Sequence, residues 1–291
     1  MFMNPANSNL CFSNSIVSAL LNIPHFNKLL SKKTDQMKLY SRKNEIIAEL
    51  IRLNQTPNLS NTSTKRIRSI VSSMCERSGQ IQRTFSDNLQ HDAGEFLISL
   101  LEHLFSDSII SSNIDEEIFG GLYQEKIVCK CGKSTELPVQ KLSEVLMTPL
   151  QGQSIESCLI NFLSDESIKH DCKKCGNQNA VKTIEMITEP STLIIQLKRY
   201  TYNVKEGEII KRQDDIECPK SLAMPSGSTF TLSSIVNHIG PSPTDGHYNV
   251  LLHDHMNDCF VLLDDLNISY DMNINSDIRK LCYIVVYTKD D

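Results

Sequence analysis

The chain has no tryptophan, few aromatic residues (6%) and no long run of hydrophobic or basic residues. No stretch is long enough to span a bilayer as a helix, so we expect no membrane protein. The apolar run near the N-terminus, from Ile16 to Leu21, is short and follows no basic residue, which argues against a signal peptide. The net charge of −6 and the lack of clustered lysine and arginine argue against nucleic-acid binding.

What the chain does have is enough apolar sequence, 40% of 291 residues, to bury a core as one large or two modest domains. It also has ten cysteines. Without a secretory signal, we expect reduced thiols in an intracellular protein of the cytoplasm or nucleus. Five of the cysteines stand alone in the sequence and are expected to be small buried hydrophobic residues: Cys75, Cys158, Cys218, Cys259 and Cys282.

Helical periodicity dominates the first hundred residues. The apolar spacing predicts helices over residues 11–22, 35–53 and 88–105. Pro24 is expected to end the first helix, and Asp87 is expected to cap the third. The first of these helices places Cys11 at a helix N-terminus.

From residue 118 onward the pattern changes to short strands. Alternating or continuous apolar runs predict strands at residues 123–130, 134–142, 180–187, 191–200, 247–254, 259–265 and 281–288. One helix, over residues 155–162, interrupts them. Helices followed by strands indicate an α+β protein rather than a parallel α/β sheet.

Cys11 is a candidate nucleophile because of its predicted place in the first helix. The partial positive charge and free N–H groups of a helix N-terminus favour a thiolate and can also hold an oxyanion. From spacing alone, a buried structural cysteine remains the open alternative.

His247 is the candidate base among the eight histidines. It follows a glycine-containing loop at the start of an apolar strand, and such loops often carry catalytic groups. An acid that orients the imidazole is expected nearby, and Asp264 and Asp265 end the next predicted strand. The open alternative is that these aspartates simply end that strand.

Two pairs of close cysteines resemble a structural zinc site: Cys129 with Cys131, and Cys172 with Cys175. Four thiolates suit tetrahedral zinc, and a glycine after each pair permits a tight turn. No ligand position is left open, so the zinc is expected to be structural. The alternative is two pairs of thiols without metal.

Taken together, these segments resemble the ubiquitin-specific protease family of papain-like deubiquitinases. The paired cysteines are one of five blocks that agree in order. NLCFSNS at residues 9–15 is similar to the family's N-T-C-Y-x-N-S, and QHDAGEF at 90–96 is similar to its Q-Q-D-A-H-E-F. LIIQLKRY at 193–200 is similar to L-I-I-H-L-K-R-F. GHY at 246–248 with LDD at 263–265 is similar to G-H-Y with F-D-D.

The resemblance implies a single catalytic domain over residues 1–291 with a papain-like, right-hand architecture. Its parts are a helical thumb at 1–117, zinc-binding fingers at 118–190 and a palm sheet at 191–291. It also implies Cys11 as nucleophile, His247 as general base and then acid, and Asp264 as the orienting acid.

Asp92 and Glu95 are the residues that the resemblance places against the ubiquitin tail. A pair of carboxylates suits the bidentate contacts of an arginine-containing tail. The alternative for Asp92 is capping of the helix that follows, which is compatible with tail binding.

The chain departs from the family pattern beside the nucleophile. Ala6 stands where the family carries an oxyanion-donating asparagine, and Asn4, Asn7, Asn9 or backbone N–H groups are the possible substitutes. Loss of one such donor costs about a hundredfold or more in rate. Three further departures are Ser8, Leu10 and Gly94, the last in place of a histidine.

The expected function is thiol-dependent hydrolysis of the isopeptide bond after ubiquitin's C-terminal glycine, with one structural zinc ion and no catalytic cofactor. The expected partner is ubiquitin or a ubiquitin-like protein and its conjugates, bound by a monomer. The alternatives are an isopeptidase for another modifier such as SUMO and a catalytically weak member that binds ubiquitin. A zinc-dependent structural or interaction protein is the third, but it leaves Cys11 and the GHY block unexplained.

Overall fold

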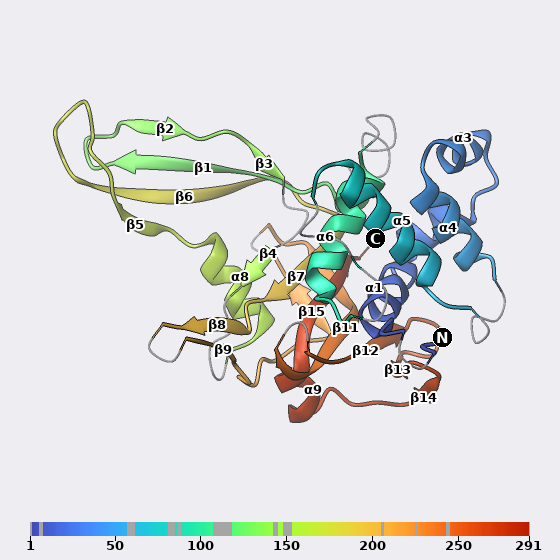
Figure 1. The fold of residues 1–291 in the computed structure, drawn as a ribbon. Helices are drawn as coiled ribbons and strands as arrows, with labels where there is room; N and C mark the ends of the chain where they lie inside the picture. The colour runs from blue at the N-terminus through green and yellow to red at the C-terminus, as the bar shows by residue number, and fades with distance from the viewer. Residues whose placement is uncertain are drawn as a thin grey trace.

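The structure is a computed structural model, and it describes residues 2–5, 8–56, 62–80, 85, 89–106, 118–141, 145–147, 153–204, 207–224, 226–242 and 245–290. The first hundred residues form helices and the remainder is mainly strands (Figure 1). The helices are α1 Cys11–Leu21, α2 Pro24–Ser31, α3 Asp35–Lys43, α4 Glu45–Asn54, α5 Lys65–Arg77, α6 Ala93–Leu104, α8 Ile155–Leu163 and α9 Ser276–Leu281.

The first helix ends at Leu21, before Pro24, as predicted, and two other helix predictions needed correction. Pro24 itself is the first residue of α2, where proline lacks only an N–H that would be unbonded anyway. The helix predicted over 35–53 is two helices, because the Asn44 side chain accepts hydrogen bonds from the N–H groups of Ile46 and Ile47 and starts α4. The helix predicted from residue 88 starts at Ala93 with Asp92 as its cap, and Asp87 lies outside the described residues.

The strands of the described residues form two larger sheets and one hairpin. The five-stranded sheet contains β1 Leu122–Cys129, β2 Ser134–Glu136, β3 Gln140–Lys141, β5 Glu166–Lys169 and β6 Asn179–Thr188. The eight-stranded sheet contains β4 Val145–Met147, β7 Thr192–Leu197, β10 Ser221–Ala223, β11 Thr229–Ser242, β12 Asp245–Asp254, β13 Cys259–Asp264, β14 Asn267–Ser269 and β15 Cys282–Lys289. The hairpin pairs β8 Tyr200–Asn203 with β9 Glu208–Lys211.

The long central strand β11 is the most deeply buried of the elements that the sequence predictions did not include. It pairs with both β12 and β15, and its middle is buried although it contains four polar residues: Ser233, Ser234, Asn237 and His238. These residues hide the apolar pattern of a buried strand. Inside the sheet, the Asn237 side chain donates to Asn249 Oδ1 at 3.0 Å, which satisfies part of this buried polarity.

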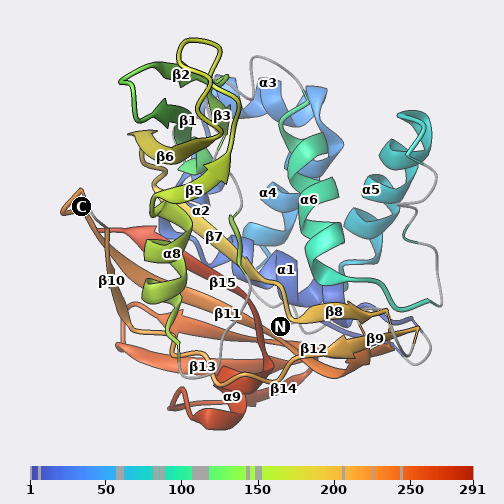
Figure 2. The ribbon, with the colours of Figure 1, turned by 90° about the vertical axis from the view of Figure 1, so that its left-hand side faces the viewer.

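Two cores hold the eight-stranded sheet in place. One lies between its upper face and the N-terminal helices, above all α1 and α6 (Figure 2). The other covers the opposite face and includes α8 and residues of α9. β4 and α8 come from the segment predicted as fingers, yet they join this sheet and its second core. The five-stranded sheet projects away from the helices (Figure 1).

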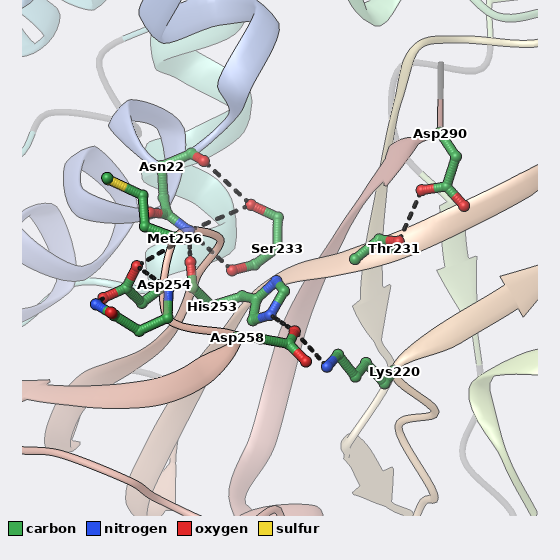
Figure 3. A network of polar contacts seen from close by, with 10 residues as sticks. Asn22, Lys220, Thr231, Ser233, His253, Asp254, Met256, Asp258 and Asp290 are labelled. Carbon is green, nitrogen blue, oxygen red and sulfur yellow. Dashed lines mark hydrogen bonds and ion pairs between the residues drawn. The ribbon is translucent and has the colours of Figure 1, made fainter.

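A polar joint fastens the end of α1 to the eight-stranded sheet. The Asn22 side chain, just beyond α1, donates to the carbonyls of Ser233 at 3.0 Å and His253 at 3.1 Å (Figure 3). These bonds tie the helix that begins with Cys11 to β11 and β12. The helix is therefore a fixed support for its first residue.

Candidate active site

Cys11 is the first residue of α1 and is only 2% exposed. Leu10 precedes it and gives the helix no side-chain cap. The first turn is anchored instead by a buried chain of hydroxyls. Ser13 Oγ donates to the Leu10 carbonyl at 3.0 Å and lies 2.6 Å from Thr64 Oγ1. The uncapped N-terminus therefore keeps its partial positive charge beside the thiol.

His247 and Asp264 come together at one end of the antiparallel pair β12–β13, as the sequence predicts. His247 Nε2 lies 2.5 Å from Asp264 Oδ1, and the two side chains are 34% and 37% exposed. Because Nε2 is occupied by the carboxylate, Nδ1 is left for Cys11. The hydrogen bond with Cys11 is the largest influence on the imidazole and, with Asp264 and against burial, raises the pKa of His247 to about 9.

Asp265 has a different set of contacts from Asp264. Its carboxylate accepts from Asn4 Nδ2 at 2.9 Å and from Asn14 Nδ2 at 3.3 Å. Asn4 Oδ1 in turn accepts from the N–H of Leu10 at 2.9 Å. Asp265 therefore steadies the segment that leads into the nucleophile rather than the imidazole.

These contacts bear on the substitutes for the missing oxyanion asparagine. One N–H of the Asn4 amide donates to Asp265, and the amide oxygen accepts from Leu10. Ala6 and Asn7 lie outside the described residues. Asn9 has a left-handed backbone conformation, with φ of 46°, at the turn into α1. Backbone N–H groups at the start of α1 have no partner within the helix, and they are the candidate donors beside Cys11.

Asp92 and Glu95 lie on the first turn of α6 but differ in exposure. Asp92 is 5% exposed, and its Oδ1 caps the helix by accepting from the Glu95 N–H at 2.9 Å. Its Oδ2 accepts from Tyr283 Oη at 2.7 Å and from Tyr248 Oη at 3.4 Å. Burial raises the pKa of Asp92, and these bonds oppose that effect. Glu95 is exposed.

The side chain of Gln196 occupies the space beside Gly94 that a side chain at position 94 would need. A Cβ atom at Gly94 would lie 2.4 Å from Gln196 Nε2, so no side chain fits there while Gln196 keeps its position. Both positions carry histidine in the family blocks quoted above. The two departures therefore belong to one packing arrangement between α6 and β7.

The four cysteines predicted to bind zinc do converge, at the tip of the five-stranded sheet. Cys129 Sγ lies 3.6 Å from Cys175 Sγ, and Cys131 Sγ lies 3.8 Å from Cys172 Sγ. A tetrahedral site with Zn–S bonds of 2.3 Å requires sulfurs roughly 3.8 Å apart. The donor set and its spacing therefore fit a metal ion of this kind.

The turns around this cluster have the backbone geometry that the sequence predicts. Gly132 and Gly176, which follow the two pairs, have φ of 79° and 71°. Backbone N–H groups of Lys174 and Cys175 donate to Cys172 and lower its thiol pKa to about 6. A thiolate at this position is the form that binds metal.

None of the described helices has both the length and the apolar character needed to cross a bilayer.

Known proteins give an independent view of this arrangement. The family model described as ubiquitin carboxyl-terminal hydrolase matches residues 4–287. Ubiquitin carboxyl-terminal hydrolase 48 of Danio rerio is 30% identical over 195 residues, which are 60% of this chain and 18% of that protein. Probable ubiquitin carboxyl-terminal hydrolase 8 of Schizosaccharomyces pombe is 26% identical and is matched over 62% of this chain and 41% of its own length. The matches thus cover well under half of these relatives.

A solved structure extends the likeness to the whole fold. The structure of the Ubp8/Sgf11/Sus1/Sgf73 module of SAGA bound to ubiquitin aldehyde superposes with a TM-score of 0.79 at 20% identity, and covers 100% of this chain and 69% of the matched chain. The α+β, papain-like right-hand fold is therefore the fold of this chain. With a family model that spans residues 4–287, the chain belongs to the ubiquitin carboxyl-terminal hydrolase family.

Proposed function

We propose that this chain is a cysteine-type deubiquitinase that hydrolyses the isopeptide bond after the C-terminal glycine of ubiquitin. The observation that carries the proposal is the convergence of Cys11, His247 and Asp264 from three separate elements, with His247 hydrogen-bonded to both of the others. Membership of the family and the names of the relatives support ubiquitin as the modifier.

The chemistry follows from the roles of the three side chains. His247 takes the proton of Cys11, and the thiolate attacks the carbonyl carbon of the terminal glycine. The imidazolium then protonates the leaving lysine amine as the C–N bond breaks, which leaves an acyl-enzyme. His247 next removes a proton from water, which attacks the thioester and frees Cys11. Asp264 keeps the imidazole oriented and stabilises its charged form.

Backbone N–H groups at the start of α1 are the proposed oxyanion donors, because the Asn4 amide is held in place by Asp265 through one N–H and by Leu10 through its oxygen. Without a side-chain donor at position 6, we expect a turnover about a hundredfold below that of an enzyme that has one.

Tail recognition is proposed for Glu95 and Asp92. Glu95 is exposed and can receive an arginine side chain directly. Asp92 is buried, and a tail contact would require its carboxylate to exchange bonds with Tyr248 and Tyr283. Glu95 is therefore expected to contribute more to binding.

A structural zinc ion is proposed at Cys129, Cys131, Cys172 and Cys175, where it would supply cross-links between two turns and no chemistry at Cys11. Metal analysis of the purified protein should find about one zinc per chain. Cys172→Ser should lose that metal and expose the five-stranded sheet to proteolysis. Full protease resistance of a metal-free protein would contradict the proposal.

Residues 1–291 are proposed to act as one catalytic domain, with thumb at 1–117, fingers at 118–190 and palm at 191–291, and as a monomer. None of the ten cysteines forms a disulfide, which supports a reducing compartment, the cytoplasm or nucleus.

The test uses probes that carry a C-terminal electrophile on ubiquitin, on SUMO and on a close ubiquitin relative. Wild-type protein should form a covalent adduct with the ubiquitin probe, and Cys11→Ala should form none. An adduct with another modifier alone would reassign the substrate. Binding of ubiquitin with no adduct would replace the hydrolase by a ubiquitin-binding protein.

A further inference from the structure

A half-buried lysine, Lys211, lies behind the catalytic histidine, on a hairpin that the sequence does not reveal. Lys211 on β9 donates to the carbonyls of His238 at 2.7 Å and Gly240 at 3.0 Å, and its Nζ lies 2.9 Å from His238 Nδ1. Three acceptors match the three N–H groups of an ammonium. Burial lowers the pKa of Lys211 to about 8, and the charge of Arg199 adds to this effect.

The contacts of Lys211 decide the tautomer of His238. An ammonium only donates, so the Nδ1 atom that it faces must be unprotonated. Tyr200 Oη lies 2.6 Å from the same nitrogen, and Tyr200 is the cross-strand partner of Lys211 in the hairpin. Burial, together with the charges of Lys211 and His247, lowers the pKa of His238 to about 3. His238 is therefore neutral, and the proton that this assigns to Nε2 has no hydrogen-bond partner among the described residues.

The Nε2 side of His238 is packed directly behind Gly246, the residue before the catalytic histidine. A Cβ atom at Gly246 would lie 2.8 Å from His238 Nε2 and 2.2 Å from the Ile239 carbonyl oxygen. From the other side, the Gly246 N–H donates to Gln90 Oε1 at 2.5 Å. Ile239 is also the register partner of His247. The peptide that carries His247 is thus held between the thumb and the end of β11.

We propose that Lys211 is a positioning residue for His247 and acts through His238 and the end of β11. The inference rests on the proposed function for its kinetic consequence. Lys211 binds the two carbonyls on either side of Ile239, and it fixes the ring that supports Gly246. Loss of this support leaves His247 free to move away from Cys11, whereas the surface that binds the modifier stays unchanged.

The test compares Lys211→Met with Lys220→Met, a matched removal of an exposed palm lysine that pairs with Asp258. With a fluorogenic amide of ubiquitin, Lys211→Met should lower kcat about 10- to 100-fold, the cost of a small misplacement of a catalytic group. Its KM should stay within about twofold of wild type, and Lys220→Met should match wild type in both constants. Lys211→Gln retains two N–H donors and should fall between wild type and Lys211→Met.

A second readout does not depend on substrate. In NMR spectra of labelled histidine, the His247 signals should shift in Lys211→Met and stay in place in Lys220→Met. If wild-type protein does not turn over the amide, the proposed function fails, and the spectra still test the positioning role. Unchanged kcat and unchanged His247 signals in folded Lys211→Met would overturn the inference. If Lys211→Met does not fold, the same two measurements, kcat and the His247 signals, are made on Lys211→Gln, and no change in either would overturn the inference.

Discussion

Two histidine–aspartate pairs lie at opposite ends of the same hairpin, β12–β13. At one end His247 Nε2 is 2.5 Å from Asp264 Oδ1, and at the other His253 Nε2 is 3.0 Å from Asp258 Oδ1. Both side chains of the first pair are about one third exposed, 34% and 37%. In the second pair the imidazole is 4% exposed and the carboxylate 69% exposed.

Their surroundings suit the first pair to the proposed catalytic role and the second to a structural role. His247 faces Cys11 at the uncapped start of α1. His253 packs 5.0 Å from the Phe260 ring, and its aspartate also receives Lys220 (Figure 3). A histidine–aspartate pair can therefore act in catalysis only where the fold places a third group, here the Cys11 thiol, beside the imidazole. The two ends of α1 face the two ends of the hairpin. Cys11 begins the helix and meets His247, whereas Asn22, just beyond the helix, donates to the carbonyl of His253.

The largest difference is expected from replacing each aspartate by asparagine. Asp264→Asn should lower kcat for the ubiquitin amide about 10²- to 10⁴-fold, because the imidazole loses the group that orients it and stabilises its charge. Asp258→Asn, the matched change at the other end, should leave kcat within about twofold. Equal losses from the two variants would mean that the pairs are not functionally distinct.

A pH profile should separate the pairs next. Because the pKa of His247 is raised from 6.5 to about 9, its imidazolium should persist to that pH, and kcat/KM should decline above it. Asp264→Asn removes a charge that raises this pKa, so the alkaline limb should move to lower pH. Asp258→Asn should not move it. If the alkaline limb of the profile does not shift in Asp264→Asn, the Asp264 carboxylate is not a cause of the raised pKa of His247.

The same raised pKa has a consequence for stability. Protonated His247 stabilises the folded state fully below its unfolded pKa of 6.5, and this contribution is lost as pH rises through about 9. Thermal unfolding of wild type against His247→Gln should therefore differ most at low pH.

Removal of the second imidazole should affect stability rather than catalysis. His253→Ala should destabilise the protein by about 2 kcal/mol, because a buried ring that packs on Phe260 is lost. Denaturant unfolding measures this change, and kcat per folded molecule should equal that of wild type. A tenfold lower kcat per folded molecule would show that His253 reaches the active site.

The smallest effect is expected from the outer partner of the second pair. Lys220 and Asp258 are both largely exposed, so solvent screens their attraction. Lys220→Met should change neither the melting temperature nor kcat within experimental error. A clear loss of stability would mean that the pair is less screened than its exposure indicates.

Motifs with a local chemical signature were predictable from the sequence. Cys11 at a helix start, His247 after a glycine loop and the four paired cysteines each have neighbours that favour one structure. His247 lies near the start of one predicted strand, and Asp264 ends the next strand, which follows after a short turn. Because antiparallel neighbours bring these two ends together, the juxtaposition of His247 and Asp264 could be predicted as well.

What could not be predicted depends on contacts between distant segments. Lys211 and His238 meet only because β9 packs against β11, and no spacing in the chain signals that contact. Asn44 breaks a periodic helix by a capping bond that competes with the apolar pattern. The burial of Asp92 could not be predicted either, since Tyr248 and Tyr283 reach it from the far end of the sequence.

The most direct measurement is kcat/KM on a fluorogenic ubiquitin amide for wild type, His247→Gln and His253→Gln, each corrected for the fraction folded. His247→Gln should lose about 10⁴-fold or more, and His253→Gln should stay within about twofold of wild type. Comparable activity of His247→Gln and wild type would show that His247 is not the catalytic base.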